Sequence, residues 1–107
     1  MKQTITLELF HAAFRELRPD NFSQAGLDEL FDYLENLELD TGKDIELDVI
    51  ALCCEFGEGD IYDISEIYDL DTPEDEDEAF NIVLKFLDDK GVLVATTKRD
   101  TFIYRQF

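Results

Sequence analysis

Basic residues are scarce in this sequence of 107 residues, which has nine Lys and Arg against 27 Asp and Glu. The formal net charge of −18 and the lack of a basic–aromatic patch argue against direct binding to nucleic acid. No Gly-rich phosphate-binding loop is present. No apolar run approaches 18 residues and no basic-then-apolar segment opens the chain, so we expect no membrane span, no signal peptide and a cytoplasmic location.

Histidine is limited to His11, and helical spacing places it opposite the apolar stripe of its segment. We therefore expect an exposed side chain there and not a base that could activate a nucleophile. The segment 69–74 has the acidic spacing of a calcium loop, but Pro73 stands at the third ligand position and the required Gly is missing. The sequence therefore predicts a non-enzymatic protein with no metal and no cofactor. A small carboxylate-based, metal-dependent enzyme is the minor alternative.

The longest apolar run lies within Ile45–Phe56, where six consecutive apolar residues precede two glycines. A run this short is typical of a strand that is buried on both faces, so we expect a central strand with Leu52 and Cys54 buried. We also expect it to pair antiparallel with the C-terminal segments. In a strand, the adjacent Cys53 and Cys54 would point to opposite faces, which predicts two buried free thiols and not a disulfide.

Apolar residues recur at helical spacing in four other segments and alternate in two C-terminal ones. Ser23 and Gly42 have the residue types that cap the two ends of a helix. The expected helices are Thr6–Arg18, Ser23–Gly42, Asp63–Leu70 and Pro73–Asp89, and the expected hairpin strands are Val92–Thr97 and Thr101–Phe107. The predicted fold is α+β in the order ααβααββ, a two-layer domain over residues 1–107 in which amphipathic helices pack on a three-stranded, mostly antiparallel sheet.

Acidic residues are concentrated in residues 19–84, where 22 of them accompany one basic residue, Lys43. On the second expected helix, Asp28, Asp32 and Glu35 fall within one narrow sector. Like charges at this spacing destabilise a helix, so helix stability does not explain why these residues are all acidic. The candidate partner-binding residues are Asp28, Glu29, Asp32, Glu35, Glu58, Asp60, Asp63, Glu66, Glu74, Asp75, Glu76, Asp77 and Glu78.

A surface this acidic favours association with a basic surface and repels nucleic acid and membranes. Duplex DNA carries about one negative charge per 1.7 Å of its axis, and a rigid protein with many carboxylates approximates that density. The charge pattern therefore predicts a protein that occupies a nucleic-acid-binding groove. If the carboxylates are not the contacts, exposed aromatic residues such as Tyr62 or Tyr68 are the better candidates.

The segment Phe22–Phe56, with LDELFDYLENLELDTGKDIELDVIALCCEF, resembles a group of small acidic proteins encoded by bacteriophages and prophages. The likeness covers about a third of the chain and runs from a helix through a Thr-Gly turn to Cys-Cys-Glu. The likeness implies that the protein is encoded by a phage or prophage, but it does not indicate any catalysed reaction. Small acidic phage proteins include antirestriction and anti-CRISPR inhibitors, and several of these are DNA mimics.

The leading hypothesis is a phage-type acidic inhibitor that binds the basic surface of a host nucleic-acid-binding protein or nuclease complex, with Asp and Glu replacing phosphates. The alternative is a structural or adaptor protein whose charge only keeps it soluble. No direct contact with nucleic acid or membrane is expected. The sequence leaves open whether the protein is a monomer or a dimer.

Overall fold

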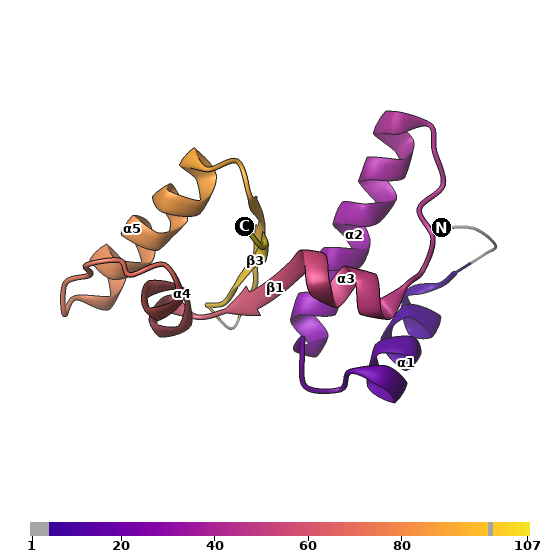
Figure 1. Ribbon diagram of the computed structural model, residues 1–107, viewed down its shortest axis with the longest axis horizontal. Helices are drawn as coiled ribbons and strands as arrows, with labels where there is room; N and C mark the ends of the chain where they lie inside the picture. The colour runs from indigo at the N-terminus through magenta and orange to yellow at the C-terminus, as the bar shows by residue number, and fades with distance from the viewer. Residues whose placement is uncertain (1–4, 99) are drawn as a thin grey trace.

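A three-stranded antiparallel sheet separates two groups of helices (Figure 1). The computed structural model describes residues 5–98 and 100–107, so Arg99 of the expected hairpin turn lies outside the described residues. The strands are β1 (Phe56–Gly59), β2 (Leu93–Thr96) and β3 (Phe102–Arg105), in the order β1-β3-β2. The α+β class and the antiparallel sheet are those that the sequence predicts, and the order of elements matches apart from one additional helix before β1.

The first two helices begin and end where their capping residues predict. In α1 (Leu7–Leu17) the side chain of Thr6 accepts a hydrogen bond from the backbone N–H of Leu9. In α2 (Gln24–Thr41) the Ser23 hydroxyl accepts one from Gly26 N–H at 2.9 Å. Gly42 ends α2 in the left-handed region, with φ 69°, which costs glycine little. Local capping by Thr6, Ser23 and Gly42 is therefore sufficient to define the start of α1 and both ends of α2.

The predicted central strand Ile45–Phe56 is wrong for most of its length. Its apolar run forms a short helix, α3 (Val49–Glu55), and only Phe56 continues into β1. The carboxylate of Asp48 caps α3 by accepting a hydrogen bond from Ala51 N–H at 3.1 Å. The helix buries Val49 and Leu52, a spacing of three residues, and leaves Cys54 exposed, contrary to the expectation that Cys54 is buried.

The sheet position of this segment also differs from the prediction. β1 is an edge strand, and β3 is the central one. The antiparallel pairing with the C-terminal hairpin is confirmed, since Phe56 lies opposite Arg105 and Gly59 lies opposite Phe102. A strand of four residues is enough to connect the two groups of helices, because its two ends lead directly into α3 and α4.

The last two helices start at other residues than expected. α4 covers Ile61–Ile67, capped by Asp60, and α5 covers Glu76–Asp89, capped by Asp75. The expected start of α5 at Pro73 is wrong because Asp75 provides the stronger cap, accepting hydrogen bonds from two backbone N–H groups. Pro73 lies in the segment that precedes the helix.

Helices cover both faces of the sheet, where the sequence predicted two layers. Ile103 of β3 packs into a core with α1, α2 and α3, whereas its neighbours Phe102 and Tyr104 pack into a second core with α4 and α5. Side chains alternate across a strand, so one strand contributes to both cores. The molecule measures 46 × 29 × 22 Å and is elongated along the direction that joins the two cores (Figure 1).

In the part of the chain that the structure describes, no helix is both long and apolar enough to cross a bilayer.

Candidate acidic binding surface

Carboxylates surround the N-terminal ends of α4 and α5. Asp60 and Asp63 form a reciprocal capping box at the start of α4, with side-chain to backbone distances of 2.9 and 3.1 Å. Asp75 caps α5, whose first turn carries three further acidic residues, Glu76, Asp77 and Glu78. Negative charge is favourable at a helix N-terminus, so part of this acidity stabilises the two helices.

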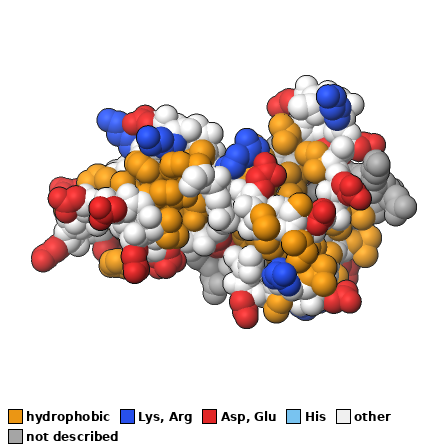
Figure 2. Space-filling view, viewed as in Figure 1, with side chains coloured by type: hydrophobic (Ala, Val, Ile, Leu, Met, Phe, Trp, Pro, Cys, Tyr) orange, Lys and Arg blue, Asp and Glu red, His pale blue; other side chains and the backbone are white. Residues whose placement is uncertain are grey.

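Together these side chains form what we call the α4–α5 acidic surface. It contains the predicted residues Asp60, Asp63, Glu66, Glu74, Asp75, Glu76, Asp77 and Glu78. Seven of the eight are exposed, and Asp60 is half-buried. None of them forms an ion pair with a Lys, Arg or His among residues 5–98 and 100–107. Acidic side chains gather over α4 and the N-terminal end of α5 in the space-filling view (Figure 2).

Basic side chains on the same group of helices lie at the other end of α5. Lys85 and Lys90 are exposed on the last turns of α5 and just after it. Asp88 and Asp89 are also exposed there, and Figure 2 shows Lys, Arg and acidic side chains together over this end. Positive and negative charges therefore balance at the C-terminal end of α5, whereas the acidic N-terminal end is not neutralised locally.

Two adjoining depressions lie within the α4–α5 acidic surface, and Tyr62 lines both of them. The first has a volume of about 320 Å³ and includes Asp77 and Phe80 in its lining. The second has a volume of about 330 Å³ and includes Pro73. Both are lined by Tyr62 and Glu76, whose side chains are joined by a hydrogen bond of 3.4 Å from the Tyr62 hydroxyl. We call the two depressions together the Tyr62 groove.

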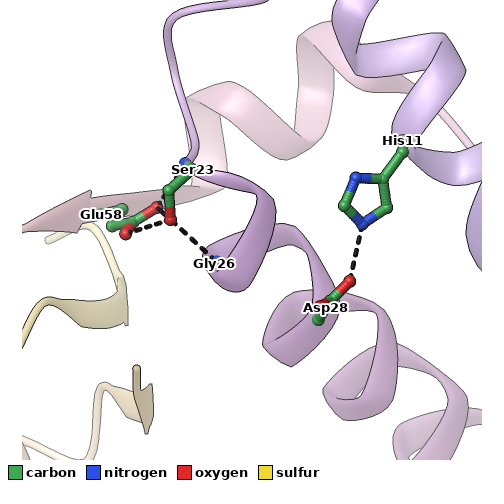
Figure 3. A network of polar contacts seen from close by, with 5 residues as sticks. All are labelled: His11, Ser23, Gly26, Asp28 and Glu58. Carbon is green, nitrogen blue, oxygen red and sulfur yellow. Dashed lines mark hydrogen bonds and ion pairs between the residues drawn. The ribbon is translucent and has the colours of Figure 1, made fainter. Parts of the chain in front are cut away.

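The predicted acidic residues of α2 lie on the other side of the sheet (Figure 1). Asp28 is exposed but contacts His11 of α1, with Nε2 and Oδ1 2.7 Å apart (Figure 3). His11 is therefore half-buried at a helix–helix contact, and not freely exposed as expected. Asp32 is exposed, whereas Glu29 and Glu35 are half-buried. The structure thus divides the predicted set into two separate surfaces.

Glu58 belongs to neither surface, because its carboxylate is hydrogen-bonded inside the protein. Ser23 donates to it from the backbone N–H at 2.8 Å and from the hydroxyl at 2.7 Å, and the Thr101 hydroxyl donates at 2.5 Å. Figure 3 shows Glu58 of β1 pointing at the first turn of α2. The carboxylate joins α2, β1 and the β2–β3 turn, so Glu58 has a structural position that its charge alone did not reveal.

The two cysteines are free and have unequal environments. Cys53 is half-buried, and burial raises the pKa of its thiol, whereas Cys54 is exposed. Among the described residues, no group of three or more His, Cys, Asp or Glu side chains is placed to hold a metal ion. The acidic clusters are therefore spread along the surface and do not converge on one point.

Sequence reasoning identified the acidic residues but missed their relation to Tyr62. Tyr62 and Glu76 are 14 residues apart, and Asp100 reaches the same groove from the β2–β3 turn. The sequence did contain one indication that Tyr62 is exposed, because Tyr62 precedes the buried Ile64 by two positions in a short helix and so lies off its apolar face.

Comparison with protein-family models, curated proteins and solved structures found no match.

Proposed function

We propose that this protein is a non-enzymatic inhibitor, of the kind carried by bacteriophages, that occupies the nucleic-acid-binding surface of a bacterial defence protein in the host cytoplasm. The observation that carries the proposal is the α4–α5 acidic surface. Its exposed carboxylates have no basic partner among the described residues, and they lie on α4 and α5 or directly before them. Lys and Arg side chains that normally contact phosphates would pair with these carboxylates.

The charge density supports a phosphate mimic. A net charge of −18 over a long axis of 46 Å is one charge per about 2.6 Å, against about one per 1.7 Å in duplex DNA. The N-terminal end of α5 is acidic, whereas Lys85 and Lys90 accompany Asp88 and Asp89 at its C-terminal end, so the mimic would present the N-terminal end to the partner. This orientation favours the α4–α5 acidic surface over the α2 residues, of which Asp28 already has a partner in His11.

Competition with nucleic acid tests the proposal. Proteins captured from a bacterial lysate on the immobilised protein are purified, and each is bound to its labelled DNA or RNA. We expect the acidic protein to release the nucleic acid at stoichiometric concentration, and the release to fade as salt rises, because screening weakens contacts between exposed charges.

A matched pair of variants locates the effect. Replacing Glu74, Asp77 and Glu78 by the corresponding amides removes three charges from the α4–α5 acidic surface. Replacing Asp32, Asp40 and Asp44 by Asn removes three charges elsewhere. The proposal requires the first variant to lose most of the competition and the second to keep it. If the nucleic acid stays bound to every captured protein in the presence of the wild-type chain, the proposal is wrong.

A further inference from the structure

The Tyr62 groove has the composition of a site for basic side chains. Its two depressions share an aromatic ring, Tyr62, which is 67% exposed, and a carboxylate, Glu76. Ile61 also lines both depressions, and further apolar side chains are Phe80 in the first and Pro73 and Ala79 in the second. The groove therefore combines apolar surface with negative charge at its rim.

We infer that the Tyr62 groove docks an extended, arginine-rich segment of the partner protein, with one arginine side chain in each of its two depressions. The inference rests on the proposed function and names the chemistry of its partner. Arginine has an apolar stem and a planar cation, so it matches a groove that is apolar in its lining and acidic at its edge. Its guanidinium can stack on the Tyr62 ring while it pairs with a carboxylate.

Charge complementarity selects this occupant among the alternatives. Four carboxylates line the first depression, from Asp60, Glu76, Asp77 and Asp100, and two line the second, from Glu74 and Glu76. A nucleic acid or an acidic peptide would be repelled. A small divalent cation would leave the aromatic ring unused, and no described cluster of carboxylates is placed to hold a metal ion.

The arginines of the segment are expected at alternate positions. Alternate residues of an extended chain point to the same side, so residues i and i+2 can face the groove together while residue i+1 faces solvent. Each guanidinium group would then occupy a depression that Tyr62 and Glu76 help to line. A lysine in place of an arginine keeps the charge but loses the planar group that stacks and pairs in two places, so we expect weaker binding.

A fluorescent synthetic peptide with alternating Arg and Ser tests the inference by anisotropy at about physiological ionic strength, where long-range attraction is screened beyond roughly 8 Å. Tyr62→Ala is expected to weaken binding about two- to fivefold, the loss of a cation–π contact at an exposed site. Glu76→Gln is expected to weaken it by a similar factor. Asp32→Asn, the matched control, removes the same charge from α2 and is expected to leave binding within about 1.5-fold.

Two further measurements keep the result unambiguous. Circular dichroism and thermal melting check that each variant is folded, which we expect because Tyr62, Glu76 and Asp32 are exposed. Amide NMR shifts during a titration of the wild-type protein with the peptide should be confined to residues 60–62, 72–80 and 100. A peptide with Lys in place of Arg should bind more weakly than the Arg peptide.

Several outcomes would overturn the inference. One is that Glu76→Gln and Asp32→Asn weaken peptide binding equally, and another is that the amide NMR shifts spread over α2. The inference is also wrong if the Arg peptide does not bind, or if micromolar Ca²⁺ or Mg²⁺ displaces it. Equal losses would leave the proposed function in place, since it requires the α4–α5 acidic surface as a whole and not Tyr62 and Glu76 in particular. If instead the peptide binds in the groove and no captured partner releases its nucleic acid, the groove inference stands and the proposed function fails.

Discussion

Glu58 and Tyr62 lie four residues apart and have opposite environments. The Glu58 carboxylate accepts hydrogen bonds from Ser23 and Thr101 in a partly buried place, whereas the Tyr62 side chain is mostly in solvent and lines two acidic depressions. One side chain connects parts of the fold and the other is free to contact a partner. At the scale of single residues, charge alone therefore does not separate structural from binding positions.

Substitution of Glu58 tests its structural position. We expect Glu58→Ala to lower the free energy of unfolding by about 1–3 kcal/mol, because the Ser23 and Thr101 donors lose their acceptor in a partly buried place. Urea unfolding followed by circular dichroism measures the change. Glu66→Ala, at an exposed position of α4, is the control and should cost less than about 0.5 kcal/mol. Equal costs for the two variants would contradict the structural position of Glu58.

The dependence of stability on alkaline pH tests the burial of the Tyr104 hydroxyl and the partial burial of the Cys53 thiol. Burial raises the pKa of the Tyr104 hydroxyl, with nearby Tyr68 adding to the effect, and burial also raises the pKa of the Cys53 thiol. Both groups are neutral when protonated, so above their ordinary pKa values of 10.0 and 9.0 the unfolded chain holds fewer protons than the folded one. Stability is therefore expected to be full below about pH 9 and to fall as pH rises from there.

Urea titrations between pH 7 and 11 measure this loss. Tyr104→Phe should reduce the fall above pH 10, since the variant has no buried hydroxyl to deprotonate on unfolding. Tyr62→Phe, at an exposed position, should leave the pH dependence as in the wild type. A Tyr104→Phe variant with an unchanged alkaline slope would show that burial of this hydroxyl does not govern the loss.

At the scale of helices and strands, local signals predicted α1 and α2 well because each has a capping residue beside an apolar stripe. The run Val49–Cys54 gave no such period, since every residue in it is apolar and a buried strand and a short helix are equally compatible with it. Asp48, as a cap, decides for the helix. The adjacency of Tyr62 and Glu76 was unpredictable, because it depends on how α4 packs against α5.

Two substitutions in α3 distinguish the helix from the strand that the sequence suggested. A strand that buries Leu52 would also bury Ile50 on the same face, whereas α3 leaves Ile50 43% exposed and Leu52 only 5% exposed. Leu52→Ala is expected to cost about 2–5 kcal/mol of unfolding free energy, and Ile50→Ala about 1 kcal/mol or less. Similar large losses in urea unfolding for both variants would contradict the helix.

At the scale of the whole molecule, one short sheet connects two cores, and the charge is distributed unevenly over them. The Ile103 side of β3 faces one core and the Phe102 side faces the other, so the two groups of helices are held by the same three strands. A net charge of −18 on this elongated body opposes folding through self-repulsion. The acidity therefore has a stability cost, which is partly offset where carboxylates cap α3, α4 and α5.

Salt is accordingly expected to stabilise the fold. Raising NaCl from 50 to 500 mM screens repulsion among exposed carboxylates and should raise the melting temperature. A variant that combines Asp32→Asn with Glu66→Gln, both exposed and away from the first helical turns, should show a smaller rise. Scanning calorimetry measures both. A melting temperature independent of salt would show that self-repulsion does not significantly destabilise the fold.

The central claim is that the α4–α5 acidic surface replaces phosphates on a basic partner, and the salt dependence of binding to the purified partner tests it most directly. We expect Kd to rise steeply between 50 and 300 mM NaCl, by at least about tenfold, as for other contacts made by many exposed charges. The Glu74, Asp77 and Glu78 amide variant should bind more weakly and with a shallower slope. A Kd that stays constant with salt, or an unchanged slope in this variant, would contradict the claim.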